Sequence, residues 1–90
     1  MREIISTAAF RKDFKRLDRS SQHDLALLKQ TINLLVESAA LPEKYRDHPL
    51  GSNWNGYREC HIRPDWLLIY QLTAVNLTLV RTGSHSDLFG

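Results

Sequence analysis

The chain has 90 residues, 42% of them hydrophobic, and a formal net charge of +2 at pH 7. This length fits one domain over residues 1–90 and is too short for two, because domains typically begin at about 50 residues and peak near 100–150. The hydrophobic content favours a folded globule over a disordered tail. The mildly basic charge alone does not distinguish a nucleic-acid binder from other globular proteins.

Cys60 is the one cysteine, which excludes an intrachain disulfide and a four-cysteine metal site. A reducing compartment, the cytoplasm, is therefore the expected location. The first residues carry charged side chains and no apolar stretch, so no secretory signal is visible. The longest aliphatic and aromatic run, Trp66 to Tyr70, is far below the ~20 residues that span a bilayer.

A strand and two antiparallel helices are expected in the first half. The strand covers residues 2–6, and Ser6 or Thr7 caps a helix whose apolar face consists of Phe10, Phe14 and Leu17. A capping box over residues 21–24, from Ser21 to Asp24, begins a second helix. The apolar face of that helix is Leu25, Leu28, Ile32 and Leu35. We expect the helix to reach about Ala40, because Pro42 forbids its continuation.

The first helix carries a block of cations: Arg11, Lys12, Lys15, Arg16 and Arg19. Such a block is more often a solvated helix face than a binding surface, and contact with RNA phosphates is the alternative.

Three strands are expected in the second half. A long loop without periodicity runs from Pro42 to about Asn55, and loops of this length usually serve a function. The strands cover 57–63, 66–73 and 77–82, joined by tight turns at 64–65 and 74–76. The order β-α-α-β-β-β predicts an α+β fold, with the two helices packed on a mainly antiparallel sheet.

Strand pairing predicts which side chains share a face of this sheet. If each turn has two central residues, His61 pairs with Leu68, and Leu68 pairs with Arg81. Cross-strand partners share a face, so His61 and Arg81 project from the same side. The opposite face, expected to pack on the helices, carries Cys60, Ile62, Leu67, Ile69 and Val80. A shift of one residue in the register would turn the side chains of a strand to the other face of the sheet.

The residues that can carry chemistry follow residue 42: His48, His61, His85, Asp65 and Arg81. Imidazole titrates near neutrality, so it can remove a proton from a nucleophile and give one to a leaving group. RNA cleavage needs both steps, at the attacking ribose 2′-OH and at the leaving 5′-oxygen. A guanidinium such as Arg81 can stabilise the phosphorane between them. The set suffices for metal-free RNA cleavage.

Structural explanations compete with these assignments. A lone histidine is usually structural, and we place His23 in that class outright. Asp65 follows a proline and is a common turn residue, Trp66 can pack in a core, and Trp54 can plug the long loop. Phe89 stands close to the end of the sequence, has little reason to be buried, and could stack on a base.

A zinc site built from His48, His61, His85 and Asp65 is the chemical competitor. Arg81 argues against it, because a permanent cation disfavours a dication and favours phosphate. None of the familiar helical histidine spacings is present. We therefore expect no metal and no other cofactor.

Four segments resemble the YafQ branch of the RelE/ParE toxin superfamily: YRDHPL at 45–50, WNGYRECHI at 54–62, PDWLLIY at 64–70 and RTGSHSDLF at 81–89. The resemblance implies one RelE-like toxin domain and a ribosome-dependent mRNA endonuclease of a type II toxin-antitoxin system. It also implies that a cognate antitoxin inhibits the enzyme and that operator DNA is contacted only through that antitoxin. A membrane is not among the implied partners.

The resemblance places functional positions at His48, His61, Asp65, Trp66, Arg81, His85 and Phe89. We expect His85 to protonate the leaving 5′-oxygen, and His48 or Asp65 to take the 2′-OH proton. His61 would position the phosphate, and Phe89 and Trp66 would hold a base of the codon. The first helix would touch ribosomal RNA phosphates, and the products would be a 2′,3′-cyclic phosphate and a 5′-hydroxyl.

A toxin without catalysis is the second hypothesis, as in the ParE-like members of the superfamily, which act on DNA gyrase. Such a protein has no need for three imidazoles, an aspartate and an arginine in one place. If these side chains were dispersed over the folded surface, the hypothesis of a toxin without catalysis would be favoured.

Overall fold

The computed structural model describes residues 2–20, 23–37 and 41–90. Its sheet has the order β1-β5-β4-β3-β2. The first strand, β1 (Glu3–Ser6), is parallel to β5 (Asn76–Gly83). All other pairings, which involve β2 (His48–Pro49), β3 (Arg58–Arg63) and β4 (Trp66–Leu72), are antiparallel.

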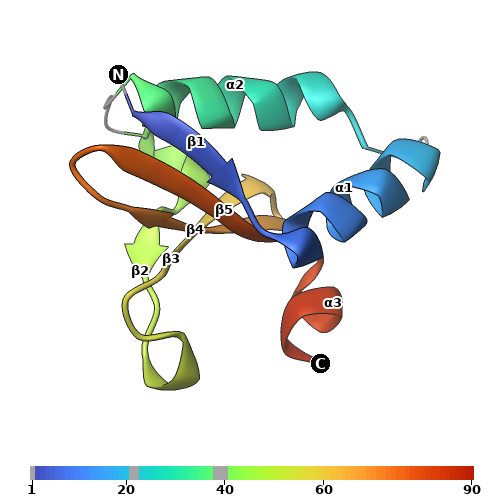
Figure 1. Ribbon diagram of the computed structural model, residues 1–90. Coiled ribbons are helices and arrows are strands. Elements are labelled where there is room, and N and C mark those ends of the chain that lie inside the picture. Colours follow the sequence, from blue (N-terminus) through green and yellow to red (C-terminus); the bar gives the residue numbers. More distant parts are fainter. Residues whose placement is uncertain (1, 21–22, 38–40) are drawn as a thin grey trace.

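The two long helices, α1 (Ala8–Ser20) and α2 (Leu25–Val36), lie on one side of the sheet and run in roughly opposite directions (Figure 1). The short helix α3 (His85–Phe89) lies on the other side (Figure 1). This arrangement confirms the predicted α+β fold. Of the helices in the described residues, none has the length and apolar character that a membrane crossing requires.

Both long helices begin at a side chain that accepts an amide hydrogen bond. Before α1, Thr7 Oγ1 accepts from the Phe10 N–H at 3.0 Å, so Thr7 is the cap among the two candidates. The predicted capping box before α2 is wrong, because Asp24 is itself the N-cap and accepts from the Ala26 N–H at 3.0 Å. Residues 21–22 lie outside the described residues, as do residues 38–40, where the helix was expected to end.

Both predicted hairpin turns have two central residues, and a β-bulge follows in each hairpin. Arg63 pairs with Trp66 across the first turn. In the second turn the Thr73 N–H donates to the Asn76 carbonyl at 2.9 Å, which leaves Ala74 and Val75 as the central residues. The register then shifts by one residue in β3, between His61 and Arg63, and again between β4 and β5. A bulge has this effect because two residues of one strand oppose one residue of its partner.

The two register shifts turn the side chains of β4 to the face opposite to the one predicted. Between β3 and β5 the effect of one shift cancels that of the other. His61 pairs with Leu67, and Arg81 pairs with Ile69, whereas Leu68 was expected in both places. Leu67 and Ile69 are two positions apart on β4, so His61 and Arg81 still share a face, as predicted. The predicted apolar face is wrong for Leu67 and Ile69, which lie on the side away from α1 and α2.

Each face of the sheet has its own apolar cluster. The main core under α1 and α2 includes Phe10, Leu17, Leu28, Leu35, Cys60, Leu68, Tyr70, Leu77 and Leu79, with Ile62 packed against it. The smaller cluster on the opposite face consists of Leu67, Ile69 and Leu88, with Leu50, Trp54, Tyr57 and Val80 around them. Val80 was expected on the helix side and is the third residue placed on the wrong face. Burial of one such side chain contributes about 1.5–3 kcal/mol, which is enough to hold α3 and the long loop on this face.

The long loop contains structure that the sequence did not predict: η1 (Glu43–Tyr45), β2 and η2 (Ser52–Trp54). Because β2 is an edge strand, it tolerates Pro49, which cannot donate to a ladder. Asp47 fastens the loop to the sheet. Its carboxylate accepts from the Tyr70 hydroxyl and from Arg58 Nε and Nη2, at 3.3 and 3.2 Å for the arginine. This network anchors the residue next to His48.

Candidate active site

Three histidines lie beside one another on the sheet face opposite α1 and α2. The ring centroid of His61 is 6.3 Å from that of His48 and 5.6 Å from that of His85. His61 belongs to β3, His48 reaches the site through the pairing of β2 with β3, and His85 is the first residue of α3. The structure therefore brings together the three imidazoles that the sequence singled out.

Asp65, in the β3–β4 turn, orients His85. Its Oδ1 accepts a hydrogen bond from the His85 backbone N–H at 3.0 Å and lies 2.7 Å from the ring Nδ1. The backbone hydrogen bond and the ring contact hold the pKa of the Asp65 carboxyl below its ordinary value. An ionised Asp65 requires a proton on Nδ1, which leaves Nε2 of His85 for proton exchange with a substrate.

The helix that carries His85 was not among the elements expected from the sequence. Ser84 Oγ accepts from the Asp87 N–H, and the Asp87 carboxylate accepts from the Ser84 N–H, both at 3.1 Å. This reciprocal pair is a capping box. Its Ser-x-x-Asp signature is readable in the sequence, but α3 has five residues and is too short to show a helical period.

Glu59 is a buried carboxylate between two of the histidines, and the sequence analysis missed it. Its side chain is 6% exposed, and Oε1 lies 3.1 Å from His61 Nε2 and 3.8 Å from His48 Nε2. A signal was available, because Glu59 precedes His61 by two positions in a strand and must share its face. A buried carboxylate needs a cationic or hydrogen-bonding partner, and His61 supplies it.

Hydrogen-bond partners distinguish the proton states of His61 and His48. The two ring nitrogens of His61 face acceptors, the Pro64 carbonyl at 3.3 Å and Glu59, so the imidazolium satisfies both. In His48, Nδ1 lies 2.6 Å from the Arg46 carbonyl oxygen, which fixes the proton there. Because 3.8 Å is too long for a hydrogen bond to Glu59, Nε2 of His48 remains the basic nitrogen.

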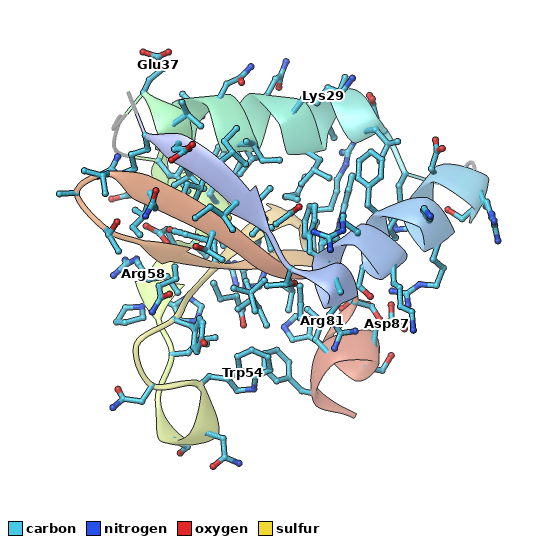
Figure 2. The ribbon with its side chains drawn as sticks, viewed as in Figure 1. Lys29, Glu37, Trp54, Arg58, Arg81 and Asp87 are labelled. Carbon is cyan, nitrogen blue, oxygen red and sulfur yellow. The ribbon has the colours of Figure 1, made fainter. Side chains whose placement is uncertain are left out.

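Arg81 is held in place from α1. Asp13 is 2% exposed and accepts from Arg81 Nε at 2.6 Å, from Nη2 at 3.1 Å and from the Thr82 backbone N–H at 3.2 Å. The hydrogen bond to Asp13 raises the pKa of Arg81 above its ordinary value. In the part of the chain that the structure describes, no hydrogen bond occupies Nη1 of Arg81. Arg81 projects from the same side of the sheet as Trp54 (Figure 2).

Arg81 lies in the row of Glu59, with Ile69 of β4 between them. Because neighbouring strands are ~4.8 Å apart, this places its backbone roughly 10 Å from that of Glu59. Arg81 therefore starts from a strand two places away from Glu59, on the face that both share.

Trp66 does not belong to the site, and its predicted contact with a base is wrong. It is 3% exposed in the main core, where Nε1 donates to Thr82 Oγ1 at 3.0 Å. The edge-to-face ring of His23, at 4.8 Å, covers it further. The reversal of β4 explains this position, because Trp66 shares the helix side with Leu68 and Tyr70. The structural role expected of His23 is confirmed by this contact.

Phe89, in contrast, presents an aromatic surface. It is 44% exposed and meets Trp54 edge to face at 6.0 Å. Trp54 packs in the small apolar cluster and so supports the ring from one side. Phe89 lies on the helix that carries His85, and its ring is partly open to solvent.

The cluster also has the donor set of a metal site. Glu59, His61 and His85 each offer one ligand atom, and these atoms lie within 4.8 Å of one another. This set contains two of the four residues considered from the sequence and replaces His48 and Asp65 by Glu59. Imidazole and carboxylate are ordinary ligands of zinc and copper. The site can therefore serve proton transfer or, alternatively, hold a transition metal.

Known proteins share this sequence and fold. Residues 2–90 match the family model described as "Bacterial toxin of type II toxin-antitoxin system, YafQ". An "mRNA interferase toxin YafQ" of Escherichia coli (strain B / BL21-DE3) is 46% identical over 90 residues, which cover 99% of this chain and 97% of the relative.

Two solved structures are similar over nearly the whole length. The toxin chain in the crystal structure of the E. coli DinJ-YafQ complex has a TM-score of 0.89 and 45% identity, with 100% of both chains covered. A "metal-bound toxin from Helicobacter pylori" has a TM-score of 0.91 and 43% identity, over 99% of this chain and 100% of that one.

The fold and the histidine-carboxylate cluster define a small α+β toxin of the type II toxin-antitoxin class. The chain belongs to the YafQ family. This confirms the resemblance that rested on residues 45–89.

Proposed function

We propose that this protein is an endoribonuclease that cuts messenger RNA on the ribosome and is inhibited by a cognate antitoxin. The observation that carries the proposal is the convergence of three imidazoles and two carboxylates on the face that also bears Arg81. The names of the relatives support the same activity, since one is an mRNA interferase and another was crystallised with DinJ. The partner of this chain is then an antitoxin of corresponding role, which alone would contact operator DNA.

In the proposed mechanism His48 is the general base. Its free Nε2 takes the proton of the 2′-OH, while Nδ1 stays bound to the Arg46 carbonyl. Asp65 is less suited to this step, because its low pKa makes it a weak base and His85 occupies its Oδ1.

His85 is the general acid of the same mechanism. Its protonated ring, stabilised by Asp65, gives the Nε2 proton to the leaving 5′-oxygen. His61, charged beside Glu59, and Arg81 bind the phosphate and stabilise the phosphorane. The products are a 2′,3′-cyclic phosphate and a 5′-hydroxyl.

Two further surfaces complete substrate binding in this proposal. Phe89 stacks on a base of the codon. On α1, Arg11 donates to the Ser6 carbonyl and Arg16 pairs with Asp13 and Asp87, so these arginines serve the fold. The exposed cations left on that helix for ribosomal RNA phosphates are Lys12, Lys15 and Arg19.

Cleavage mapping tests the proposal. Purified protein is added to translating ribosomes, and cuts in the messenger are located by primer extension. We expect cuts within codons at the ribosome and none with the His48→Ala or His61→Ala protein. An intact messenger with wild-type protein would refute the proposed activity. A gyrase supercoiling assay on the same preparation examines the ParE-like alternative, which the gathering of the histidines disfavours.

The reaction should proceed without a transition metal. We expect the cutting rate to be unchanged when EDTA strips transition metals and magnesium is maintained for the ribosomes, because the proposed steps are proton transfers. Zinc or copper added in excess should inhibit, since Glu59, His61 and His85 would be occupied. Loss of cleavage with the chelator, restored by zinc, would overturn the metal-free mechanism.

Trp66 should contribute to the stability of the fold and not to the cleavage of RNA. We expect Trp66→Phe to lower the free energy of unfolding by about 1 kcal/mol, because the hydrogen bond to Thr82 is lost. Its cleavage rate should stay within threefold of wild type. Phe89→Leu is the matched comparison and should reduce cleavage without a change in unfolding. Urea unfolding and primer extension measure the two effects, and the reverse pattern would return Trp66 to the binding site.

A further inference from the structure

A hollow in the surface borders the histidine cluster on the side of α2. It has a volume of about 540 Å³ and lies between α2, the η1 segment and the β3–β4 turn. Its basic rim consists of Lys44, Arg46 and Arg63, and His61 forms part of its wall. We call it the basic hollow. Pockets of ~300–1,000 Å³ hold small ligands or parts of larger ones, so its size is sufficient for one segment of a polymer.

The charges of the basic hollow are uncompensated. Over the described ranges 2–20, 23–37 and 41–90, neither Lys44 nor Arg46 nor Arg63 has a carboxylate within ion-pair distance. The arginines with a structural role differ in this respect, since Arg58 is paired with Asp47 and Arg81 with Asp13. Three cations around one depression attract a polyanion, and low salt strengthens the attraction.

The backbone that presents Arg46 is held in an uncommon conformation. Arg46 has φ of 49°, in the left-handed region that a non-glycine residue seldom adopts. Its carbonyl accepts from His48 Nδ1, and the neighbouring Asp47 is anchored on Tyr70. The segment that orients the general base therefore also fixes the start of the Arg46 side chain at the hollow.

We propose that the basic hollow binds the phosphodiester backbone of the messenger strand next to the scissile bond. The inference rests on the proposed function, because His61 joins the hollow to the site where the phosphate would react. Lys44, Arg46 and Arg63 each bind a phosphate oxygen, and the strand runs from the histidine cluster over the β3–β4 turn toward α2. These residues bind substrate and take no part in proton transfer.

The test measures binding to an RNA that cannot be cut. The probe is a fluorescent, single-stranded 2′-O-methyl oligoribonucleotide, and anisotropy gives the affinity of the full-length protein over a range of salt concentrations. We expect the triple variant Lys44→Gln, Arg46→Gln, Arg63→Gln to bind at least about tenfold more weakly at low salt. The slope of log K against log salt should fall by about 2, since each phosphate on a single strand contributes ~0.7.

Two controls make the result specific. Lys29→Gln removes an exposed cation from α2, on the side away from the site (Figure 2), and should leave affinity and slope unchanged. A methylphosphonate oligonucleotide of the same length, which has no charge on its backbone, should bind the triple variant and wild type equally.

Three outcomes would overturn the proposal. The first is a triple variant with wild-type slope, and the second is an equal loss for the uncharged methylphosphonate oligonucleotide. The third is unchanged RNA binding with weakened antitoxin binding, which would assign the hollow to a protein partner. Wild-type cleavage on ribosomes is measured in parallel, so failure of the hollow and failure of the proposed function are separate results.

Discussion

Replacement of His85 by alanine should reduce the single-turnover rate of messenger cleavage by about 10²-fold or more. The structure gives His85 one nitrogen bound to Asp65 and one free, which is the arrangement a general acid needs. Binding should change little, because Phe89 on the same helix remains. Single-turnover cleavage on ribosomes, with the variant's affinity measured separately, distinguishes the two effects. A loss under threefold would remove His85 from the role of acid.

The dependence of the rate on pH tests whether Asp65 is the general base. The pKa of the Asp65 carboxyl is lowered in the folded protein, so its pairing with His85 is complete above the ordinary value and is lost only as the pH falls through the lowered one. Protonation of Asp65 therefore cannot cause a loss of rate between pH 7 and 5. If single-turnover cleavage slows in that range, the base is a group other than Asp65.

Asp65→Asn is the companion variant. The asparagine oxygen can still accept from the His85 backbone, but the charge that stabilises the imidazolium is gone. We expect a smaller loss of rate than for His85→Ala in the same single-turnover assay. A rate equal to that of the wild-type protein would show that the Asp65 charge does not act through His85.

Removal of the Asp13 carboxylate should have the largest effect on stability. In Asp13→Ala the Arg81 guanidinium loses both hydrogen bonds, and the buried Thr82 N–H loses its acceptor. Such losses cost about 2–4 kcal/mol, and for a domain of this size we expect Tm to fall by on the order of 10–20 °C. Cleavage measured well below the new Tm should also fall, because Arg81 is no longer held beside the phosphate. Thermal unfolding and single-turnover cleavage give the two values.

Two variants on α1 keep this expectation testable. Asp13→Asn retains an acceptor for the Thr82 N–H and should lose less stability than alanine does. Asp18→Ala removes an exposed carboxylate from the same helix and should change Tm very little. Equal melting of the Asp13→Ala and Asp18→Ala proteins would contradict the role of Asp13 as the anchor of Arg81.

The residues that the sequence identified are those whose chemistry is visible without knowledge of packing. His48, His61 and His85 have few alternative uses in one short segment, and both hairpin turns were placed correctly. The shared face of His61 and Arg81 was also correct, although neither assumed pairing holds. The shared face was predicted correctly because the expected register was wrong by one residue in each hairpin, and these two errors cancel.

The missing parts depend on contacts between distant segments. The position of Glu59 beside His61 follows from the strand pattern, but its contact with His48 arises only when β2 pairs with β3. Asp13 looks like one charge in a basic helix until β5 packs on α1 and places Arg81 against it. Trp66 was assigned to the site by the family resemblance. Its face depends on the strand register, which bulges shift without a signature that this sequence displays.

The two bulges mark the positions at which the strands beside β4 can change in length. In β3 the extra residue is Ile62, which stands between the pairs His61–Leu67 and Arg63–Trp66. A chain without that residue could keep both pairs, so His61 would stay on the face of Leu67. A chain that kept every residue but paired without the bulge would place His61 opposite Leu68, on the side of α1 and α2. The position of His61 therefore depends on its pairing with β4 and not on the number of residues in the hairpin.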